Sequence, residues 1–358
     1  MSIDFHKLRV AEVKRETPDA VSVRFELPEE LRETFTFRAG QHLTFRREID
    51  GEELRRNYSV CVSPSEGVLK IGVKKIAGGA FSGWVNDELK AGDVVDVMAP
   101  HGSFCWAFDE TARCEYVGFA GGSGITPVLS LLKTALAMEP HSRFTLLYGN
   151  RNSPGVMFLE EIAGLKDRYL DRLSVFHFLE EEEEEIDLFN GRLDRAKAEE
   201  LLSTLVRPDN VDAFFICGPG PMMDAVEAAL VAKGVDKPRI LIERFTTGPL
   251  SAAQAAAARV LEEKAAGLKM SVTLNGRRVQ VAFDPEKHSI LDNVRAAGLP
   301  APFACKGGVC ATCRAKVTAG EVSMKVNYGL SEQELAEGYV LTCQATPLTE
   351  GVSLTYDT

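Results

Sequence analysis

Residues 304–313 read Ala-Cys-Lys-Gly-Gly-Val-Cys-Ala-Thr-Cys, so three cysteines lie in one short loop, and a fourth follows at Cys343. The spacing C-x4-C-x2-C with a distant fourth cysteine is that of the thiolate ligands of a [2Fe-2S] cluster. The residues between these cysteines are mostly small, which lets the backbone wrap around a cluster and direct N–H groups at its sulfurs. The sequence therefore predicts Cys305, Cys310, Cys313 and Cys343 as cluster ligands.

A structural zinc site and disulfide bonds are the two other uses of these cysteines. Zinc sites usually present two separated cysteine pairs, whereas here three cysteines crowd one glycine-rich loop. The other four cysteines have no pairing rhythm, which favours reduced thiols and a cytoplasmic protein. They are Cys61, Cys105, Cys114 and Cys217.

Charge and hydropathy narrow the class of partner. The 358-residue chain has a net charge of −11, which argues against nucleic-acid binding because a phosphate backbone requires a basic surface. The N-terminus lacks an apolar signal region, and no stretch is apolar enough for a membrane span, so we expect no membrane partner. Residues 180–185 are six consecutive glutamates, which form either a solvated loop or a docking patch for a basic partner.

The first part of the chain, 1–108, reads as short strands of an antiparallel β-barrel. Leu69, Ile71 and Val73 alternate with polar or small residues, as in a half-buried strand. Further strands are expected over 41–45, 58–62 and 94–98. One helix is predicted over 81–89, because its apolar residues share a face.

The pattern changes to alternating strands and helices over 109–245, which predicts a parallel sheet covered on both faces. Residues 246–268 are rich in alanine and read as a linker that is partly helical and lets the next domain move. The last segment, 269–358, opens with two alternating runs around Asn275-Gly276, a hairpin signal. A helix over 289–297 then leads into the cysteine loop, so this segment reads as a small α+β domain.

Two short motifs in the barrel segment suit a flavin. Arg56-Asn57-Tyr58-Ser59 offers a guanidinium for phosphate, a ring for stacking and a hydroxyl for a ring nitrogen. Gly79-Ala80-Phe81-Ser82 opens the predicted helix, whose free N–H groups can bind an anion. Plain surface residues and an ordinary turn with a helix cap are the alternatives for these two motifs.

Two motifs in the α/β segment suit a dinucleotide. Gly121-Gly122-Ser123-Gly124-Ile125-Thr126-Pro127 follows an apolar strand and starts a helix, so a pyrophosphate can approach the backbone there. A structural tight turn is its alternative. Cys217-Gly218-Pro219 also lies between a strand and a helix, at the edge where α/β sheets bind ligands. Taken alone, Cys217 also suits a small buried hydrophobe.

In this order, and together with Glu243-Arg244-Phe245, these motifs resemble those of ferredoxin-NADP+ reductase-like flavoproteins. The resemblance covers the whole chain, because the C-terminal segment resembles a plant-type ferredoxin. It implies an FAD-binding barrel, a nucleotide-binding α/β domain and a β-grasp ferredoxin domain, as in the reductase components of bacterial multicomponent oxygenases.

The resemblance also implies roles for individual residues. Arg56 would bind the FAD pyrophosphate, Asn57 would line the flavin site, Tyr58 would stack on the flavin and Ser59 would lie near its N5. Phe245 would cover the other flavin face. The flavin phosphates would be bound by Gly79, Ala80, Phe81 and Ser82. The dinucleotide would be bound by Gly122, Thr126, Gly218 and Pro219. The predicted catalytic residues, which border the hydride path, are Ser59, Cys217 and Glu243.

The nucleotide preference predicted from the sequence depends on the end of the second α/β strand. An acidic residue there typically holds the ribose 2′-hydroxyl of NAD. Residues 146–153 contain no carboxylate, and Arg151 could pair with a 2′-phosphate, so we expect NADPH to be the electron donor.

The function implied is hydride transfer from NADPH to FAD, then single-electron transfer to the cluster and on to a separate oxygenase. A reductase of another acceptor, such as a Rieske dioxygenase or a hybrid-cluster protein, is the second possibility. The third is a redox-responsive interaction module with little turnover.

Overall fold

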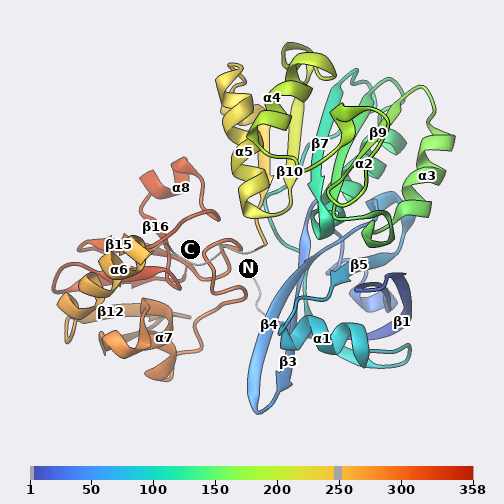
Figure 1. Cartoon of the computed structure of the whole chain (residues 1–358). Coiled ribbons are helices and arrows are strands. Elements are labelled where there is room, and N and C mark those ends of the chain that lie inside the picture. The colour runs from blue at the N-terminus through green and yellow to red at the C-terminus, as the bar shows by residue number, and fades with distance from the viewer. Residues whose placement is uncertain (1–3, 246–251, 358) are drawn as a thin grey trace. The chain divides into compact units, whose positions relative to one another are not determined.

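The computed structural model describes residues 4–245 and 252–357 (Figure 1). The chain divides into two compact units, Met1–Glu243 and Arg244–Thr358. In the described ranges, no helix combines the length and apolarity that crossing a membrane requires.

The N-terminal half of the first unit is an antiparallel sheet of six strands in the order β4-β3-β6-β1-β2-β5. A bridge between Val60 and Ile71 brings the two outer strands together, so the sheet closes into a barrel. Leu69, Ile71 and Val73 are buried, as their alternation predicts. The elements are β1 (Phe5–Thr17), β2 (Ala20–Glu26), β3 (His42–Ile49), β4 (Glu52–Ser59), β5 (Leu69–Lys74), α1 (Ala80–Asp87) and β6 (Val94–Met98).

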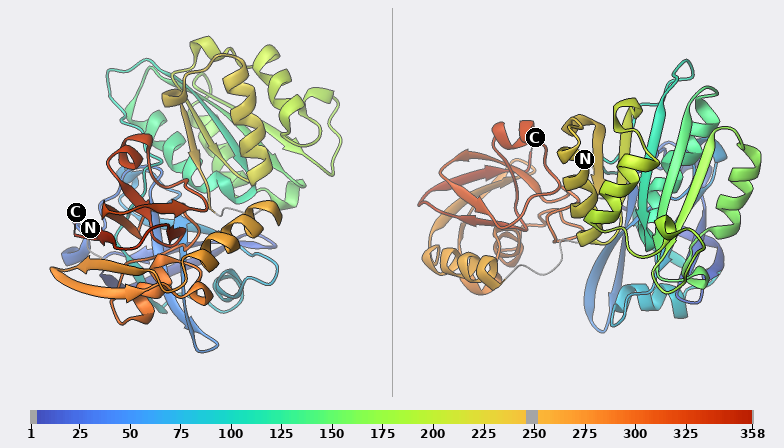
Figure 2. Two further views of the ribbon diagram at one scale, coloured as in Figure 1. Left: turned by 90° about the vertical axis from the view of Figure 1, so that its left-hand side faces the viewer. Right: turned by 45° about the horizontal axis from the view of Figure 1, so that its top comes forward.

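The C-terminal half of this unit is a parallel sheet in the order β11-β10-β7-β8-β9. Helices cover both of its faces and bury a separate apolar cluster on each, α2 and α3 on one face and α4 and α5 on the other (Figures 1 and 2). The elements are β7 (Glu115–Gly121), α2 (Ile125–Met138), β8 (Arg143–Asn150), α3 (Leu159–Arg168), β9 (Leu173–Leu179), α4 (Arg195–Thr204), β10 (Ala213–Cys217), α5 (Gly220–Ala232) and β11 (Ile240–Glu243).

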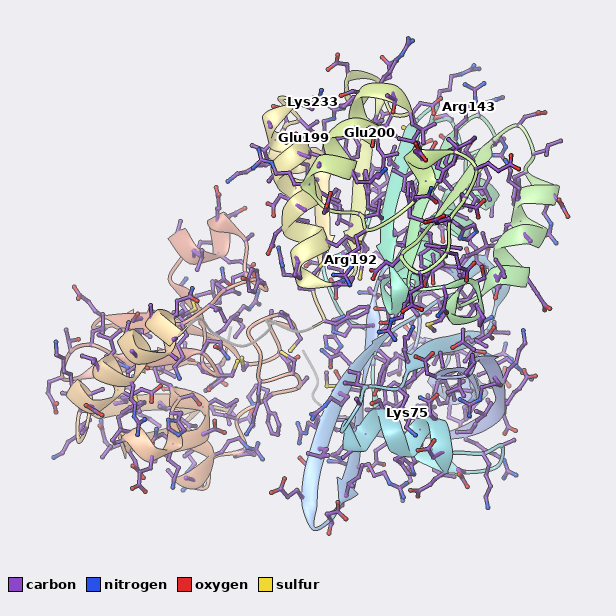
Figure 3. All side chains as sticks on the ribbon, viewed as in Figure 1. Lys75, Arg143, Arg192, Glu199, Glu200 and Lys233 are labelled. Carbon is purple, nitrogen blue, oxygen red and sulfur yellow. The ribbon has the colours of Figure 1, made fainter. Side chains whose placement is uncertain are left out.

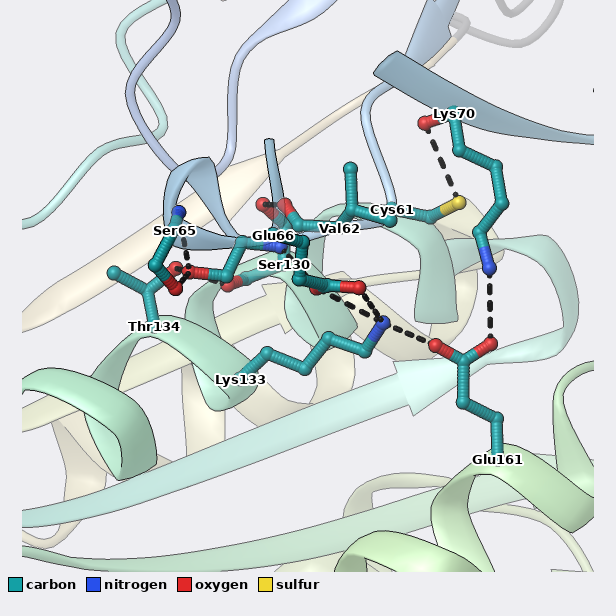
Figure 4. Close-up of polar contacts among 10 residues, drawn as sticks. Cys61, Val62, Ser65, Glu66, Lys70, Ser130, Lys133, Thr134 and Glu161 are labelled. Carbon is teal, nitrogen blue, oxygen red and sulfur yellow. Dashed lines mark hydrogen bonds and ion pairs between the residues drawn. The ribbon is translucent and has the colours of Figure 1, made fainter. Parts of the chain in front are cut away.

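A polar network joins the barrel to the α/β half (Figure 4). Lys133 of α2 is only 7% exposed and forms ion pairs with Glu66 of the barrel and Glu161 of α3. Lys70 of β5 binds the same Glu161 at 3.1 Å. Burial alone would raise the pKa of Glu161, but the two ammonium groups outweigh burial and hold that pKa below its usual value. The two halves therefore share a buried ammonium group, Lys133, and partly exposed charges that complement it and one another when the halves are together.

The second unit contains a mixed sheet in the order β13-β12-β18-β14-β16 and a two-stranded sheet of β15 and β17. Strand β12 pairs antiparallel with β13 and parallel with β18, the pairing of a β-grasp fold. Asn275 and Gly276 both have positive φ, as the predicted hairpin turn requires. The elements are β12 (Lys269–Leu274), β13 (Arg277–Ala282), α7 (Ile290–Ala296), β14 (Arg314–Ala319), β15 (Val322–Met324), α8 (Glu332–Ala336), β16 (Tyr339–Leu341), β17 (Ala345–Pro347) and β18 (Val352–Thr355).

The predicted linker 246–268 is an ordered part of the second unit over the residues that the structure describes. Helix α6 spans Ala252–Lys264, while 246–251 lie outside the described residues. Its last turn is anchored, because buried Glu262 pairs with Lys325 at 2.5 Å and with His288 at 2.9 Å, and Ala265 joins the apolar core. The alanine-rich composition concealed this anchor, which depends on partners more than 20 residues away in sequence.

Candidate functional site

Strand β4 carries the predicted flavin motif along one edge of the barrel. Tyr58 is half-buried against Phe45 and Phe81, with ring centroids 5.8 and 6.0 Å away, and burial raises the pKa of its phenol. Arg56 is exposed and donates to the carbonyl oxygen of Arg55 at 2.7 Å. Ser59 is 2% exposed, and its Oγ has no hydrogen-bond partner in the described part of the chain. A buried hydroxyl without a protein partner fits a residue that forms its hydrogen bond with a ring nitrogen of a bound flavin.

The turn before α1 is built around Ser82. The Ser82 hydroxyl accepts from the Ile76 N–H at 3.1 Å and donates to the Gly79 carbonyl at 3.2 Å. Phe81 is buried in the barrel core, whereas Ala80 is exposed at the first turn. The side chains of Ser82 and Phe81 therefore shape this turn, and the N–H groups of the first turn are left to bind phosphates.

The glycine-rich turn after β7 and the turn after β10 pack against each other. A Cβ on Gly124 would overlap the carbonyl oxygen of Cys217, and a Cβ on Gly121 would lie 2.6 Å from Pro219 Cδ. Gly122 has φ +52°, with open space where a Cβ would project. Thr126 is buried, and its hydroxyl donates to the Ser123 carbonyl at 3.0 Å. Such a glycine-lined surface at a helix N-terminus fits the close approach of a dinucleotide pyrophosphate.

The parallel pairing of β10 and β11 places their last residues, Cys217 and Glu243, side by side. Cys217 is fully buried and pairs in register with Ala120 of β7 and Glu243 of β11. Burial, and then the nearby Glu243 carboxylate, raise the pKa of the Cys217 thiol well above its usual value. Cys217 is therefore a neutral thiol, and Gly218 and Pro219 form the turn beside it.

His42, which the sequence interpretation did not single out, connects the barrel to this edge. His42 pairs in register with Ser59, and its Nδ1 lies 3.7 Å from Glu243 Oε1. Asn57 Nδ2 lies 3.3 Å from His42 Nε2, and the buried Nδ1 of His42 forms no hydrogen bond among the described residues. The His101 ring lies against His42, with centroids 4.3 Å apart. His42 thus lies between Ser59, its cross-strand neighbour, and Glu243, which pairs in register with Cys217.

Burial, and then the charge of His101, lower the pKa of His42 well below its usual value, so this imidazole is neutral. No sequence signal marked His42, because its partners are 15, 59 and 201 residues away along the chain.

The end of β8 holds the predicted nucleotide-specificity residue. Arg151 follows the strand directly, is 75% exposed, and lies 3.8 Å from the Glu181 carboxylate. Asn150, which precedes it, is 6% exposed; burial raises the pKa of the nearby Tyr148 phenol, and a hydrogen bond from the Asn150 side chain opposes part of that rise.

The four predicted ligand cysteines gather in the second unit as two pairs. The Cys305 thiol contacts Cys310, and the Cys313 thiol contacts Cys343. Among the described residues, no group of three or more His, Cys, Asp or Glu side chains is arranged to hold a metal ion. Two adjacent thiol pairs instead match the donor set of a cluster with two iron atoms.

Backbone N–H groups face the sulfurs. The N–H of Gly307 lies 3.2 Å from Cys305 Sγ, and the N–H of Cys305 lies 3.5 Å from Cys310 Sγ. Lys306 and Ala311 both have positive φ, and a Cβ on Gly308 would crowd Gln344 and Val326. The small residues of this loop thus let the backbone turn its amides toward sulfur, as the sequence pattern indicates.

Phe245, predicted to cover the flavin, belongs to the second unit and is 38% exposed. Its place over the flavin therefore stays a prediction.

Comparison with known families supports the same order of domains. Residues 7–106 match an oxidoreductase FAD-binding domain, residues 119–228 an oxidoreductase NAD-binding domain and residues 272–348 a 2Fe-2S iron-sulfur cluster binding domain.

Individual relatives are similar along nearly the whole chain. One component of the 1,2-phenylacetyl-CoA epoxidase of Escherichia coli is 43% identical over 99% of this chain and 98% of its own length. The ferredoxin reductase component of 3-ketosteroid-9-alpha-monooxygenase from Mycobacterium tuberculosis is 36% identical over 98% and 96%. The solved structure of phthalate dioxygenase reductase has the same fold, with a TM-score of 0.59, 22% identity and 98% of each chain covered.

Proposed function

We propose that this chain, which belongs to the family of oxygenase reductase components with FAD-binding, NAD-binding and [2Fe-2S] domains in one polypeptide, delivers electrons from a nicotinamide nucleotide to a separate oxygenase. Its oxidoreductase class and its three kinds of cofactor-binding domain are those of the family. The acceptor and the roles of single residues are the proposed part.

FAD, when bound, accepts two electrons as a hydride and releases them one at a time, which joins nicotinamide chemistry to an iron–sulfur cluster. In the proposed site, the Arg56 guanidinium binds the pyrophosphate and the Tyr58 ring supports the flavin. The Ser59 hydroxyl, buried without a partner, hydrogen-bonds the flavin ring. The glycine-lined turns at Gly122 and Gly218 hold the nucleotide so that its reactive end lies beside Cys217 and Glu243.

We propose that the acceptor is the oxygenase of a phenylacetyl-CoA epoxidase, in phenylacetate degradation. The observation that carries this proposal is the 43% identity to one component of such an epoxidase over 99% of the chain. Oxygenases that act on 3-ketosteroids are the second candidate, because the reductase component of such a system is 36% identical over 98% of the chain.

Reconstitution with purified oxygenases tests this proposal. The chain and the epoxidase oxygenase should together consume nicotinamide nucleotide in proportion to phenylacetyl-CoA, and capture from the native cell should recover that oxygenase. A Cys310→Ser variant serves as control, because it should reduce its flavin and fail to drive the oxygenase. Turnover with a ketosteroid oxygenase and none with the epoxidase would transfer the assignment to the second candidate.

Reduction of cytochrome c separates the reductase from an interaction module. A reductase turns over many times under steady-state conditions, whereas a module that only senses redox state does not. Absence of turnover with any acceptor would contradict the proposed function.

A further inference from the structure

The end of β8 has the features of a ligand-binding edge. Gly121 and Gly149 are paired across β7 and β8, so the glycine-rich turn and Asn150 emerge side by side from the sheet. The adenosine ribose of a dinucleotide lies at the end of this second strand when its pyrophosphate lies at the glycine-rich turn. Tyr148, which the buried Asn150 side chain contacts, donates its hydroxyl to the Gly122 carbonyl at 3.0 Å and so ties the end of β8 to the glycine-rich turn.

The donors next to Asn150 are already engaged with carboxylates. Arg151 pairs with Glu181 at 3.8 Å, and Asn152 Nδ2 donates to the same carboxylate at 2.8 Å. The Ser153 N–H donates to Glu182 at 2.6 Å, and the Ser153 hydroxyl donates to the other oxygen of that carboxylate. The donors that would bind a 2′-phosphate therefore have anions beside them already.

The backbone holds these carboxylates in place. The N–H of Glu180 donates to the Asn150 carbonyl at 3.1 Å, and the N–H of Glu181 donates to the Arg151 carbonyl at 2.9 Å. The acidic segment (Glu180–Glu182) thus runs alongside the continuation of β8. Hydrogen bonds from Ser153 lower the pKa of Glu182, so its carboxylate is ionised at neutral pH.

The charges at this corner sum to a negative value. Arg151 pairs with Glu181, and Arg192, labelled in Figure 3, pairs with Glu180 at 2.9 Å. Glu182 is the third carboxylate of the segment, and Glu183, Glu184 and Glu185 follow it in the sequence. An incoming 2′-phosphate would have to displace Glu181 from Arg151 and would then lie among several carboxylates.

We infer that the acidic segment (Glu180–Glu182) is a specificity element that rejects the 2′-phosphate and makes NADH the preferred electron donor. This inference rests on the proposed function and deepens it. The expectation of NADPH considered only the charges of residues 146–153, because the sequence alone does not show that Glu181 lies beside Arg151. A ribose 2′-hydroxyl, unlike a phosphate, can donate a hydrogen bond to a carboxylate.

Steady-state kinetics of the FAD-loaded chain, with ferricyanide as acceptor, test the inference. The wild type should show at least tenfold higher kcat/KM with NADH than with NADPH. The double variant Glu181→Gln/Glu182→Gln, which removes two charges, should lower the NADH-to-NADPH ratio of kcat/KM by at least tenfold. Tenfold is the size expected for removing a unit charge about 6 Å from a doubly charged phosphate in water.

A matched control uses the same run of glutamates. Glu183→Gln/Glu185→Gln changes the net charge equally but leaves Arg151, Asn152 and Ser153 with their present carboxylates, so it should change the preference less. A wild type that prefers NADPH, or a preference equally insensitive to both double variants, would overturn the inference. Failure of both nucleotides to reduce the flavin would instead contradict the proposed function.

Ligand binding gives a readout that does not depend on electron flow. By calorimetry on the FAD-loaded chain, 5′-AMP should bind more tightly than 2′,5′-ADP. In Glu181→Gln/Glu182→Gln, the difference in affinity between the two ligands should shrink or reverse.

The dependence on ionic strength shows whether the 2′-phosphate is repelled or attracted, because salt screens surface charges. The NADPH-to-NADH ratio of kcat/KM should rise with added salt if the 2′-phosphate is repelled; a ratio that falls would mean attraction by Arg151 and would overturn the inference.

Discussion

The imidazole of His42 faces the carboxylate of Glu243, with Nδ1 3.7 Å from Oε1, although the two residues are 201 positions apart. His42 comes from the barrel and Glu243 from the last strand of the α/β half, so the two halves of the proposed hydride path meet at these two side chains.

Replacement of His42 by alanine should slow flavin reduction by the nicotinamide nucleotide. The change removes the group that faces Glu243, and small displacements of reacting groups reduce rates by about 10- to 100-fold. Stopped-flow absorbance of the flavin measures this step, and the FAD content of the variant reports whether the site still folds. His42→Gln should recover part of the rate, and His141→Ala, at an exposed position, should change nothing. A normal rate in His42→Ala would exclude a positioning role.

The stability of the flavin-binding unit should fall below neutral pH partly because of His42. Its folded-state pKa is lowered by burial, so between about pH 6.5 and that lower value the unfolded chain binds a proton that the folded chain does not. Protonation of His42 therefore does not reduce the free energy of unfolding above about pH 6.5, and it lowers that free energy as the pH falls below this value. The temperature of flavin release, followed by fluorescence, should drop more between pH 7.5 and 5.5 for the wild type than for His42→Gln. Parallel curves would contradict this.

A methyl group on Gly124 should be far more damaging than one on Gly164. The added Cβ would overlap the Cys217 carbonyl and push apart the two turns that line the nucleotide site, whereas the same change at Gly164 in α3 meets nothing within 4 Å. We expect a loss of about 2–4 kcal/mol of unfolding free energy and weaker nucleotide binding for Gly124→Ala. Gly164→Ala should be neutral or slightly stabilising. Thermal unfolding and nucleotide titration of both variants measure the difference.

Cys310→Ser should remove the [2Fe-2S] absorption and EPR signals and leave the flavin bound. The reason is the two-pair arrangement, in which Cys305 would retain no second thiolate, while the flavin motif lies in the other unit. Cys114→Ser, at a cysteine outside the predicted ligand set, is the matched control and should keep the cluster. Stoichiometric zinc and no cluster in wild-type protein prepared without oxygen would show that the spacing had been misinterpreted.

Glu262→Gln should destabilise the second unit by about 1–3 kcal/mol, the usual effect of removing a charge-assisted hydrogen bond from a buried cation. Lys325, 17% exposed, would lose its carboxylate. The hydrogen bonds from Lys325 and His288 outweigh burial and lower the pKa of Glu262. Its contribution to the free energy of unfolding is therefore present above the usual pKa of a glutamate, and it is lost as the pH falls through and below that value. Denaturation monitored by the cluster absorption measures the effect, with exposed Glu263→Gln as control.

Deletion of part of the predicted linker would be one way to test whether the linker lets the ferredoxin domain move, but helix α6 complicates that experiment. Removing Ala252–Leu261 would delete most of α6 rather than shorten a flexible connection. A loss of electron delivery in that deletion would therefore combine damage to the second unit with any restriction of domain movement. Insertions before Ala252 test movement more cleanly.

Local patterns predicted the elements whose signals are contained in a few neighbouring residues. The alternation at Leu69–Val73, the Asn275-Gly276 turn and the glycine-rich loop of Cys305 each carry their own geometry. Strand β1 was not predicted, because charged residues occupy much of its length and burial selects only a few positions such as Leu8 and Val10.

The rest of the site depends on residues that the fold brings together over long distances. His42 and Glu243 belong to two different sheets, and Glu181 and Arg151 lie just beyond the ends of β9 and β8, so each pair meets only in the folded chain. A single sequence contains such charges without showing which of them meet, so the sequence predicted Arg151 as a phosphate ligand without its carboxylate partner.

The buried ion pairs of Lys133 also limit how this protein can be recombined. The barrel supplies Glu66 and Lys70, and the α/β half supplies Lys133 and Glu161. A chimera that kept this barrel and took its nucleotide-binding half from a relative without a matching lysine and glutamate would leave Glu66 and Lys70 at the join without their partners. Exchange of the two halves during evolution or engineering is therefore expected to be tolerated best when all four charged residues are exchanged together.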